Sequence, residues 1–183
     1  MKVGTFPRIV VIFMILVLSA LVEPAFPQAP KIVTETIIVF ASSALADSAT
    51  KDECITKCKE AAQLIKEKGM EASFQELQNK DGNFVWKDTY VFVMDFDGKH
   101  LTHPLRPELV GKNVIGFKDS NGKLVVKEFI EVAKTKGEGW VEYMYPKPAE
   151  LKKPEKERIL SKKITYIYRV PGMDIFVGAG VWE

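Results

Sequence analysis

Thr89–Pro104 reads TYVFVMDFDGKHLTHP, and this stretch establishes the class of fold. Its first six residues are rich in β-branched and aromatic side chains, which favour extended backbone. The pair Asp97-Gly98 is a frequent choice in the tight turn of a β-hairpin. Lys99–His103 is then predicted to be the returning strand, which Pro104 ends. The middle of the chain is therefore predicted to be an antiparallel hairpin.

Helical periodicity precedes and follows this hairpin. Thr50–Glu53 has the pattern of a capping box, and apolar residues beyond it recur at spacings of three and four. This pattern predicts a long helix that ends at Gly69. A shorter helix is predicted over Glu71–Gln78. Lys123–Lys136 shows the same apolar spacing, and Gly137 is its predicted end.

Three more strands are predicted in the second half of the chain, at Gly139–Tyr145, Lys163–Arg169 and Ile175–Val181. Pro146–Arg158 is rich in proline and charge and is predicted to be a solvated loop. The order is helix, two strands, helix and three strands. It predicts an α+β fold with a PAS-like five-stranded antiparallel sheet, helices on one face and the long N-terminal helix among them.

The first 46 residues differ in composition from the rest. Lys2 and Arg8 precede a charge-free apolar run, Ile9–Val22, as in a secretory signal. A second apolar segment ends at Ala44-Leu45-Ala46, which fits the small-x-small pattern of a cleavage site. Three interpretations stay open: a true start at Met14 or later, an unusually long signal, or an uncleaved anchor.

Cleavage after Ala46 is favoured because Glu35 and nearby prolines interrupt any longer apolar span. Residues 1–46 are therefore predicted to be an export segment, and residues 47–183 a single domain. We expect the protein in the periplasm or secreted, or held at the membrane by its N-terminal segment. No second apolar run follows, so we expect the domain to act with a separate partner.

The composition and motifs exclude several classes of function. The net charge is +2 and no basic stripe stands out, so nucleic acid is not a predicted partner. No Ser-x-x-Lys, G-x-S-x-G or phosphate-binding glycine loop occurs, so no enzyme and no cofactor is predicted. His100 and His103 lack further local ligands, so no metal site is predicted either.

Cys54 and Cys58 form C-x-x-x-C, one residue longer than a redox C-x-x-C motif. Four residues apart, they share one face of the predicted helix. A disulfide between them, a cross-link between two subunits of a homodimer and two buried free thiols all stay open.

Several stretches resemble, in order and spacing, the single Cache domains of bacterial extracytoplasmic sensors. They are YVFVMD at 90–95 with Asp97-Gly98, LTHP at 101–104, LVGKN at 109–113, KGEGWVEY at 136–143, PKP at 146–148, KITYI at 163–167, RVPG at 169–172 and VGAGV at 177–181. The resemblance implies a long N-terminal helix on one face of the sheet. It also implies a pocket on the other face for a small organic acid such as acetate, propionate, pyruvate or lactate.

The resemblance also implies which residues form this pocket. His103 and Lys163 match its donor positions, since a small carboxylate needs fixed donors in an apolar cavity. The implied aromatic walls are Trp140, Tyr143, Tyr145 and Tyr166. Strand alternation places Tyr143 and Tyr145 on the face opposite Trp140, so without a bulge only one set lines the pocket. A structural histidine, a surface lysine and core aromatic residues stay open as the alternative.

The predicted function is therefore an exported sensory domain that binds a short organic acid. It acts in signal transduction or chemotaxis with a separate membrane receptor or histidine kinase. Two alternatives remain. One is a periplasmic accessory or redox-linked protein that uses Cys54 and Cys58, and the other is a structural Cache fold without a ligand.

Overall fold

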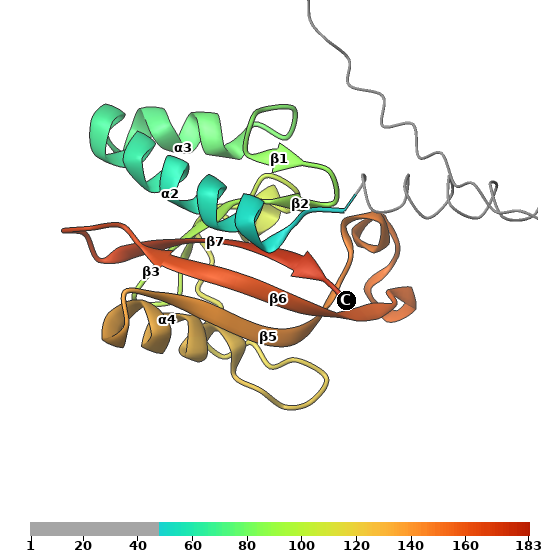
Figure 1. Cartoon of the computed structure of the whole chain (residues 1–183). Coiled ribbons are helices and arrows are strands. Elements are labelled where there is room, and N and C mark those ends of the chain that lie inside the picture. Colours follow the sequence, from blue (N-terminus) through green and yellow to red (C-terminus); the bar gives the residue numbers. More distant parts are fainter. Residues whose placement is uncertain (1–47) are drawn as a thin grey trace, which may run out of the picture.

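A five-stranded antiparallel sheet forms the middle layer of the domain (Figure 1). The computed structural model describes residues 48–183, so the predicted export segment and its cleavage site lie outside the described residues. The strands lie in the order β4-β3-β7-β6-β5. Their bounds are Phe92–Asp95 (β3), His100–Thr102 (β4), Glu138–Pro146 (β5), Leu160–Arg169 (β6) and Ile175–Trp182 (β7). The predicted α+β class and five-stranded antiparallel sheet are confirmed.

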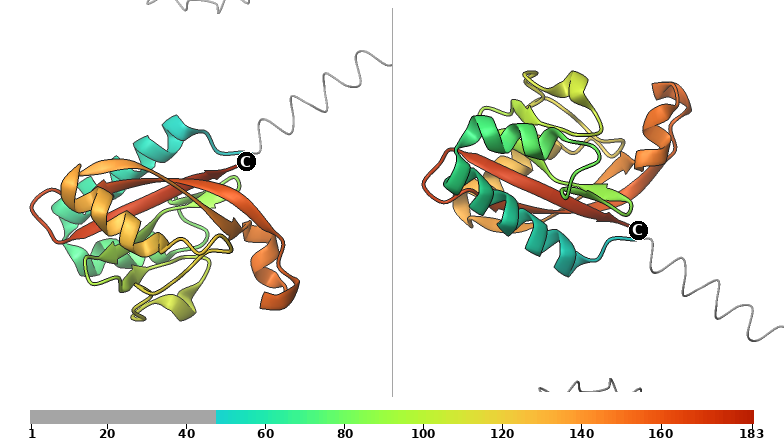
Figure 2. Two further views of the ribbon diagram at one scale, coloured as in Figure 1. Left: turned by 90° about the horizontal axis from the view of Figure 1, so that it is seen from below. Right: turned by 90° about the horizontal axis from the view of Figure 1, so that it is seen from above.

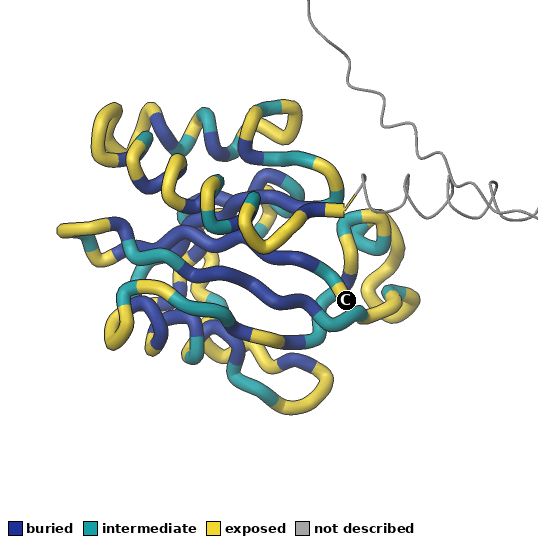
Figure 3. The backbone as a smooth tube through the Cα atoms, viewed as in Figure 1, coloured by how far each residue is buried: buried dark blue, intermediate teal, exposed yellow. Residues whose placement is uncertain are grey.

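Helices cover both faces of this sheet (Figure 2). α2, Lys51–Lys68, and α3, Met70–Gln78, lie on one face, and α4, Val125–Thr135, lies on the other. The sequence predicts helices on one face only, and this prediction is wrong. The central strand β7 explains the difference: every residue from Ile175 to Val181 is buried, so both faces of the sheet need a cover (Figure 3).

The N-terminus of α2 has the cap that its sequence predicts. The Thr50 hydroxyl accepts a hydrogen bond from the Glu53 backbone N–H, and the Glu53 carboxylate accepts one from the Thr50 N–H. This confirms the predicted capping box. Gly69, with φ of +77°, ends the helix as predicted. The buried side of α2 packs on the sheet through Cys54, Cys58, Ala61, Ala62 and Ile65.

The strand predicted over residues 89–94 is split in two. β2, Thr89–Tyr90, pairs with β1, Val85–Trp86, in a separate ribbon, and β3 begins only at Phe92. The break lies at Val91, whose N–H donates to the Phe84 carbonyl rather than to the main sheet. Tyr90 is thereby held at the edge between the ribbon and the sheet.

Two glycines of β7 make room on the α4 face. A Cβ at Gly178 would overlap the Phe92 ring. A Cβ at Gly180 would overlap the Thr165 hydroxyl and come within 2.9 Å of Lys163 Cε. Glycine at these positions therefore lets the Phe92 and Lys163 side chains lie flat against the sheet.

The long connections lie beside the sheet. Residues 103–124 include the short 3₁₀ helix Pro107–Leu109 (η1). The predicted solvated loop holds two more, Pro148–Lys152 (η2) and Glu155–Glu157 (η3), and is mostly exposed. No helix within residues 48–183 is long and apolar enough to cross a membrane.

The start of α2 and the C-terminus lie at the same end of the domain (Figure 1). Both are tied to the turn between β1 and β2. The Ala49 N–H donates to the Asp88 carboxylate at 2.8 Å, and the Trp182 indole N–H donates to the Asp88 carbonyl at 3.0 Å. One turn therefore fixes the first and last parts of the described chain relative to each other.

Candidate ligand-binding site

A cavity of about 90 Å³ lies between the sheet, α4 and the segment that follows β4. Its lining residues are Tyr90, Phe92, Met94, His100, His103, Arg106, Leu109, Val114, Phe117, Val125, Val126, Phe129, Tyr143 and Tyr145. That volume has room for about three to six water molecules. A ligand of about four to six non-hydrogen atoms would occupy a similar space. The wall is mostly aromatic and aliphatic, and the described part of the chain contributes no acidic side chain to it.

His103 is held in one tautomer within this wall. Its Nδ1 accepts a hydrogen bond from the Arg106 backbone N–H at 3.1 Å. The hydrogen of the neutral ring is therefore assigned to Nε2, which is a donor. Burial lowers the pKa of His103 well below its ordinary value and keeps the ring neutral. The ring packs against Tyr90, with centroids 4.7 Å apart.

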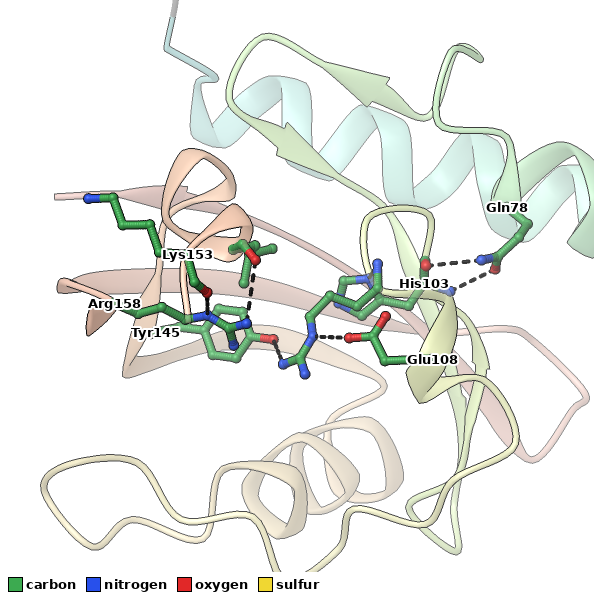
Figure 4. A network of polar contacts seen from close by, with 8 residues as sticks. Gln78, His103, Glu108, Tyr145, Lys153 and Arg158 are labelled. Atoms are coloured by element: carbon green, nitrogen blue, oxygen red, sulfur yellow. Dashed lines mark hydrogen bonds and ion pairs between the residues drawn. The ribbon is translucent and has the colours of Figure 1, made fainter. Parts of the chain in front are cut away.

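Gln78, near the end of α3, fixes the backbone of His103 (Figure 4). Its side-chain carbonyl accepts from the His103 N–H at 2.9 Å, and its side-chain N–H donates to the His103 carbonyl at 3.0 Å. The helix on one face of the sheet thus positions a residue that lines the cavity on the other.

Arg106 supplies a cation to the cavity wall. Its Nε donates to Glu108 at 2.8 Å, and its Nη1 donates to the Tyr145 hydroxyl at 3.3 Å (Figure 4). A guanidinium has five N–H groups, so further donors remain for an anion. The sequence does not predict a role for Arg106, because this residue lies in an irregular segment between two prolines and belongs to no periodic pattern.

Lys163 lies behind this wall and is fully buried. Its Nζ donates to the Tyr90 hydroxyl at 3.5 Å and lies over the rings of Tyr90 and Trp182, at 4.4 and 4.5 Å from their centroids. No carboxylate of residues 48–183 pairs with it. Burial lowers the pKa of Lys163 to about 7. Lys163 thus contacts the residues that line the cavity rather than lining it itself.

The structure brings His103, Tyr143 and Tyr145 together at the cavity, with Lys163 beside them. Trp140 and Tyr166 do not line it. They pack against each other under α2, with ring centroids 5.1 Å apart. β5 and β6 pair without a bulge from Glu138 to Pro146, so alternation keeps these two side chains on the α2 face. Their assignment as walls of this cavity is therefore corrected.

Other lining residues also escaped the sequence analysis. Tyr90, Phe92 and Met94 alternate along the stretch that predicted the hairpin, so a period of two could have placed them on one face. Phe129 contributes the floor from α4, and its ring packs edge-on against Tyr143 at 5.4 Å.

Cys54 and Cys58 are both buried free thiols. Cys58 Sγ lies 3.9 Å from the Tyr166 carbonyl oxygen, so this side of α2 faces the sheet of its own chain. Burial raises the pKa of Cys54 to about 12 and that of Cys58 well above its ordinary value. Of the three alternatives for these cysteines, the structure shows two buried free thiols, and the possible homodimer stays a prediction.

Comparison with known proteins finds sensory proteins among the relatives. Sensor histidine kinase MctS of Rhizobium johnstonii is 30% identical over 96 residues, which are 52% of this chain and 19% of that protein. Methyl-accepting chemotaxis protein McpP of Pseudomonas putida is 31% identical over 61 residues, 33% of this chain and 11% of that protein. The chain therefore matches only a small part of each relative's length.

Solved structures show the same fold. A Cache chemosensory domain, described in terms of carboxylic acid recognition, superposes with a TM-score of 0.60 and 21% identity, over 81% of this chain and 98% of that one. A methyl-accepting chemotaxis protein from Vibrio parahaemolyticus gives 0.58 and 22%, over 80% and 96%.

A family profile described as the Cache domain matches residues 52–183, which is nearly all of the described chain. Cache domains are extracytoplasmic sensory domains of chemotaxis receptors and histidine kinases, as the relatives above illustrate. This chain belongs to the Cache domain family.

Proposed function

We propose that this Cache domain binds a short monocarboxylate in the cavity between the sheet and α4, and that its occupancy is reported in receptor or histidine kinase signalling. One observation carries the proposal. The cavity is small and mostly aromatic, and no acidic side chain of residues 48–183 lines it. Arg106 and His103 lie in its wall, and Lys163 lies directly behind. An anion that leaves water for such a place needs fixed donors, and these are the donors present.

The polar and apolar parts of the cavity match the two ends of such a ligand. Arg106, the Nε2 of His103 and the hydroxyl of Tyr90 would hold the carboxylate. Val125, Val126 and Phe129 of α4 would contact the methyl or ethyl group. The volume limits the chain to about two to four carbons, the class of acetate, propionate, pyruvate and lactate.

The relatives support the same class of function. They are named as a sensor histidine kinase and a methyl-accepting chemotaxis protein, and a structural neighbour is described as recognising carboxylic acids. The alternatives have less support. A redox role needs a thiolate, and burial disfavours the thiolates of Cys54 and Cys58. A fold without a ligand would have filled its cavity, whereas here the cavity remains open between the side chains.

Isothermal titration calorimetry of the purified protein with acetate, propionate, pyruvate and lactate tests the proposal. Acetamide, which has the shape of acetate without its charge, is the matched control. We expect saturable binding of at least one of the four acids and none of acetamide. Absence of binding by all four acids, or equal binding of acetate and acetamide, contradicts the proposal.

A further inference from the structure

The amine of Lys163 is fully buried and pairs with no carboxylate among residues 48–183, which is an unusual state for a lysine. Its surroundings are aromatic: Tyr90 and Trp182 lie against Nζ, and the Tyr145 ring lies 5.6 Å away. The attraction of a cation to aromatic faces is weaker than the free energy that the charged amine loses when it leaves water. Burial therefore favours the neutral form of the amine. The amine of the ligand-free protein is therefore poised between its neutral and charged forms near neutral pH.

The titratable groups around Lys163 leave it without a partner. Tyr90 contacts the amine, and Tyr143 lies opposite Lys163 on β5. Both phenols stay neutral, because burial raises the pKa of each. On the far side, Cys54 is a buried thiol. Asp88 acts only through space and accepts its hydrogen bond from Ala49.

Three more basic groups lie on the cavity side: Arg106, His100 and His103. Arg106 is a permanent cation, and burial lowers the pKa of both His100 and His103, so that these rings are neutral. None of the three can neutralise a charge on Lys163, since each carries a positive charge or none. Apart from Asp88, which acts on Lys163 only through space, the first negative charge close to the amine would therefore be that of a bound ligand.

Tyr90 connects the amine to the cavity. Its oxygen accepts the Lys163 N–H, and its ring forms part of the cavity wall. Because that oxygen accepts from Lys163, the phenolic hydrogen is free to be donated to a carboxylate. A carboxylate in the cavity would then lie one hydroxyl group away from the amine.

We infer that the cavity takes up a proton together with its carboxylate, and that the amine of Lys163 is the group that accepts the proton. The inference rests on the proposed function and adds its regulation. The –NH₂ group becomes –NH₃⁺ with a proton from solvent, and no covalent bond to the ligand forms. The occupancy of the cavity thereby depends on pH as well as on the concentration of the carboxylate.

The sign of the pH dependence follows from linkage. The bound carboxylate raises the pKa of Lys163 above its value of about 7 in the free protein. Below that value the amine is already charged, and the affinity is constant. Above it, binding must bring in a proton, so the affinity falls by about tenfold per pH unit until the pKa of the complex is reached. Acetate itself stays ionised over this range.

The test is calorimetry of acetate binding in buffers with different heats of protonation, at about pH 6, 7 and 8. We expect the observed heat to depend on the buffer at about pH 8, with proton uptake approaching one per site, and to be nearly independent of it at about pH 6. Lys163→Met should abolish the uptake. At about pH 6 the affinity of Lys163→Met for acetate should be lower than that of the wild-type protein. The two affinities should become equal as the pH rises.

Lys162→Met is the matched control. Lys162 is the neighbouring lysine of β6, exposed and paired with Glu142 and Glu183, and its removal should leave the proton uptake unchanged. If circular dichroism shows that Lys163→Met does not fold, Lys163→Arg takes its place. Arginine keeps its charge at every pH used, so binding should occur without uptake.

The outcomes separate this inference from the proposed function. Acetate binding with a heat that is the same in every buffer overturns proton uptake and leaves carboxylate binding intact. Uptake that persists in Lys163→Met assigns the proton to another group and overturns the role of Lys163. Absence of acetate, propionate, pyruvate and lactate binding at every pH overturns the proposed function itself.

Discussion

At the scale of single residues, the site is a small set of donors whose positions are fixed by other polar groups. Arg106 is oriented by Glu108 and Tyr145, and His103 is held through its backbone by Gln78 (Figure 4). Such orienting contacts leave little rotamer freedom to be lost when a ligand binds. Two of the residues concerned, Arg106 and Gln78, can be tested singly.

Arg106→Gln should weaken the affinity for acetate by about ten- to a hundredfold, because it removes a charge-assisted hydrogen bond worth about 1.5–3 kcal/mol. Arg158→Gln is the control: Arg158 lies nearby but donates to the Leu151 and Lys153 carbonyls and does not line the cavity. Calorimetry measures both. Equal affinities of Arg106→Gln and the unchanged protein would remove Arg106 from the site.

Gln78→Leu should lower the affinity by freeing the His103 backbone, although Gln78 itself does not line the cavity. The informative readout is the ¹⁵N spectrum of the His103 ring, which reports the tautomer. We expect it to change from a single Nε2–H form to a mixture. Gln63→Leu, on the exposed side of α2, should change neither quantity. A tautomer that stays fixed in Gln78→Leu would contradict the positioning role.

At the scale of elements, the two sides of the sheet have different tasks. α2 packs tightly on one face through small residues and cysteines, whereas α4 and the segment after β4 enclose a cavity on the other. We therefore expect α4 to limit the size of the ligand, and α2 to contribute to the core on the other face.

Phe129→Ala on α4 should enlarge the cavity and shift the preference towards longer acids such as butyrate and valerate. It should also cost about 3–5 kcal/mol of stability, as large-to-small changes in a core do. Val132→Ala is the control on the same helix, because Val132 packs against Gly139 and does not line the cavity. Competition calorimetry and thermal melts check both effects. A variant that remains selective for acids of two or three carbons speaks against Phe129 as the size limit.

The thiols of α2 give a prediction about the same helix. Cys54 and Cys58 should react with a disulfide reagent only as fast as the domain unfolds, since both are buried and their pKa values are raised. Non-reducing gels of the oxidised protein should show a monomer band. Rapid labelling in native buffer, or a cross-linked dimer, would show that α2 leaves the sheet.

Local patterns predicted the elements well and the cavity less well. The capping box at Thr50 and the turn at Asp97-Gly98 encode their own geometry, so α2 and the β3–β4 hairpin followed from a few neighbouring residues. Arg106 reaches the cavity through contacts with residues far along the chain, such as Tyr145, and no local period carries that information. Strand alternation did separate Tyr143 from Trp140, although it could not tell which face holds the cavity.

At the scale of the whole molecule, the N-terminal segment remains a prediction, since residues 1–47 lie outside the described chain. We expect the mature protein to begin at Asp47. Intact-mass spectrometry of protein from the native host's envelope measures this directly. A chain that retains Ile9–Val22 and stays with the membrane fraction would instead support the uncleaved anchor.

The two ends of the described chain meet at the turn that contains Asp88. Nearby ends make a domain easy to insert into another protein, because both junctions fall at one point on the host's surface. The unit could thus be spliced into a surface loop of a fluorescent reporter with short linkers. In such a fusion Trp182, which faces the Lys163 amine, would lie next to the junction, so that a ligand in the cavity would act on the junction through Tyr90 and Lys163.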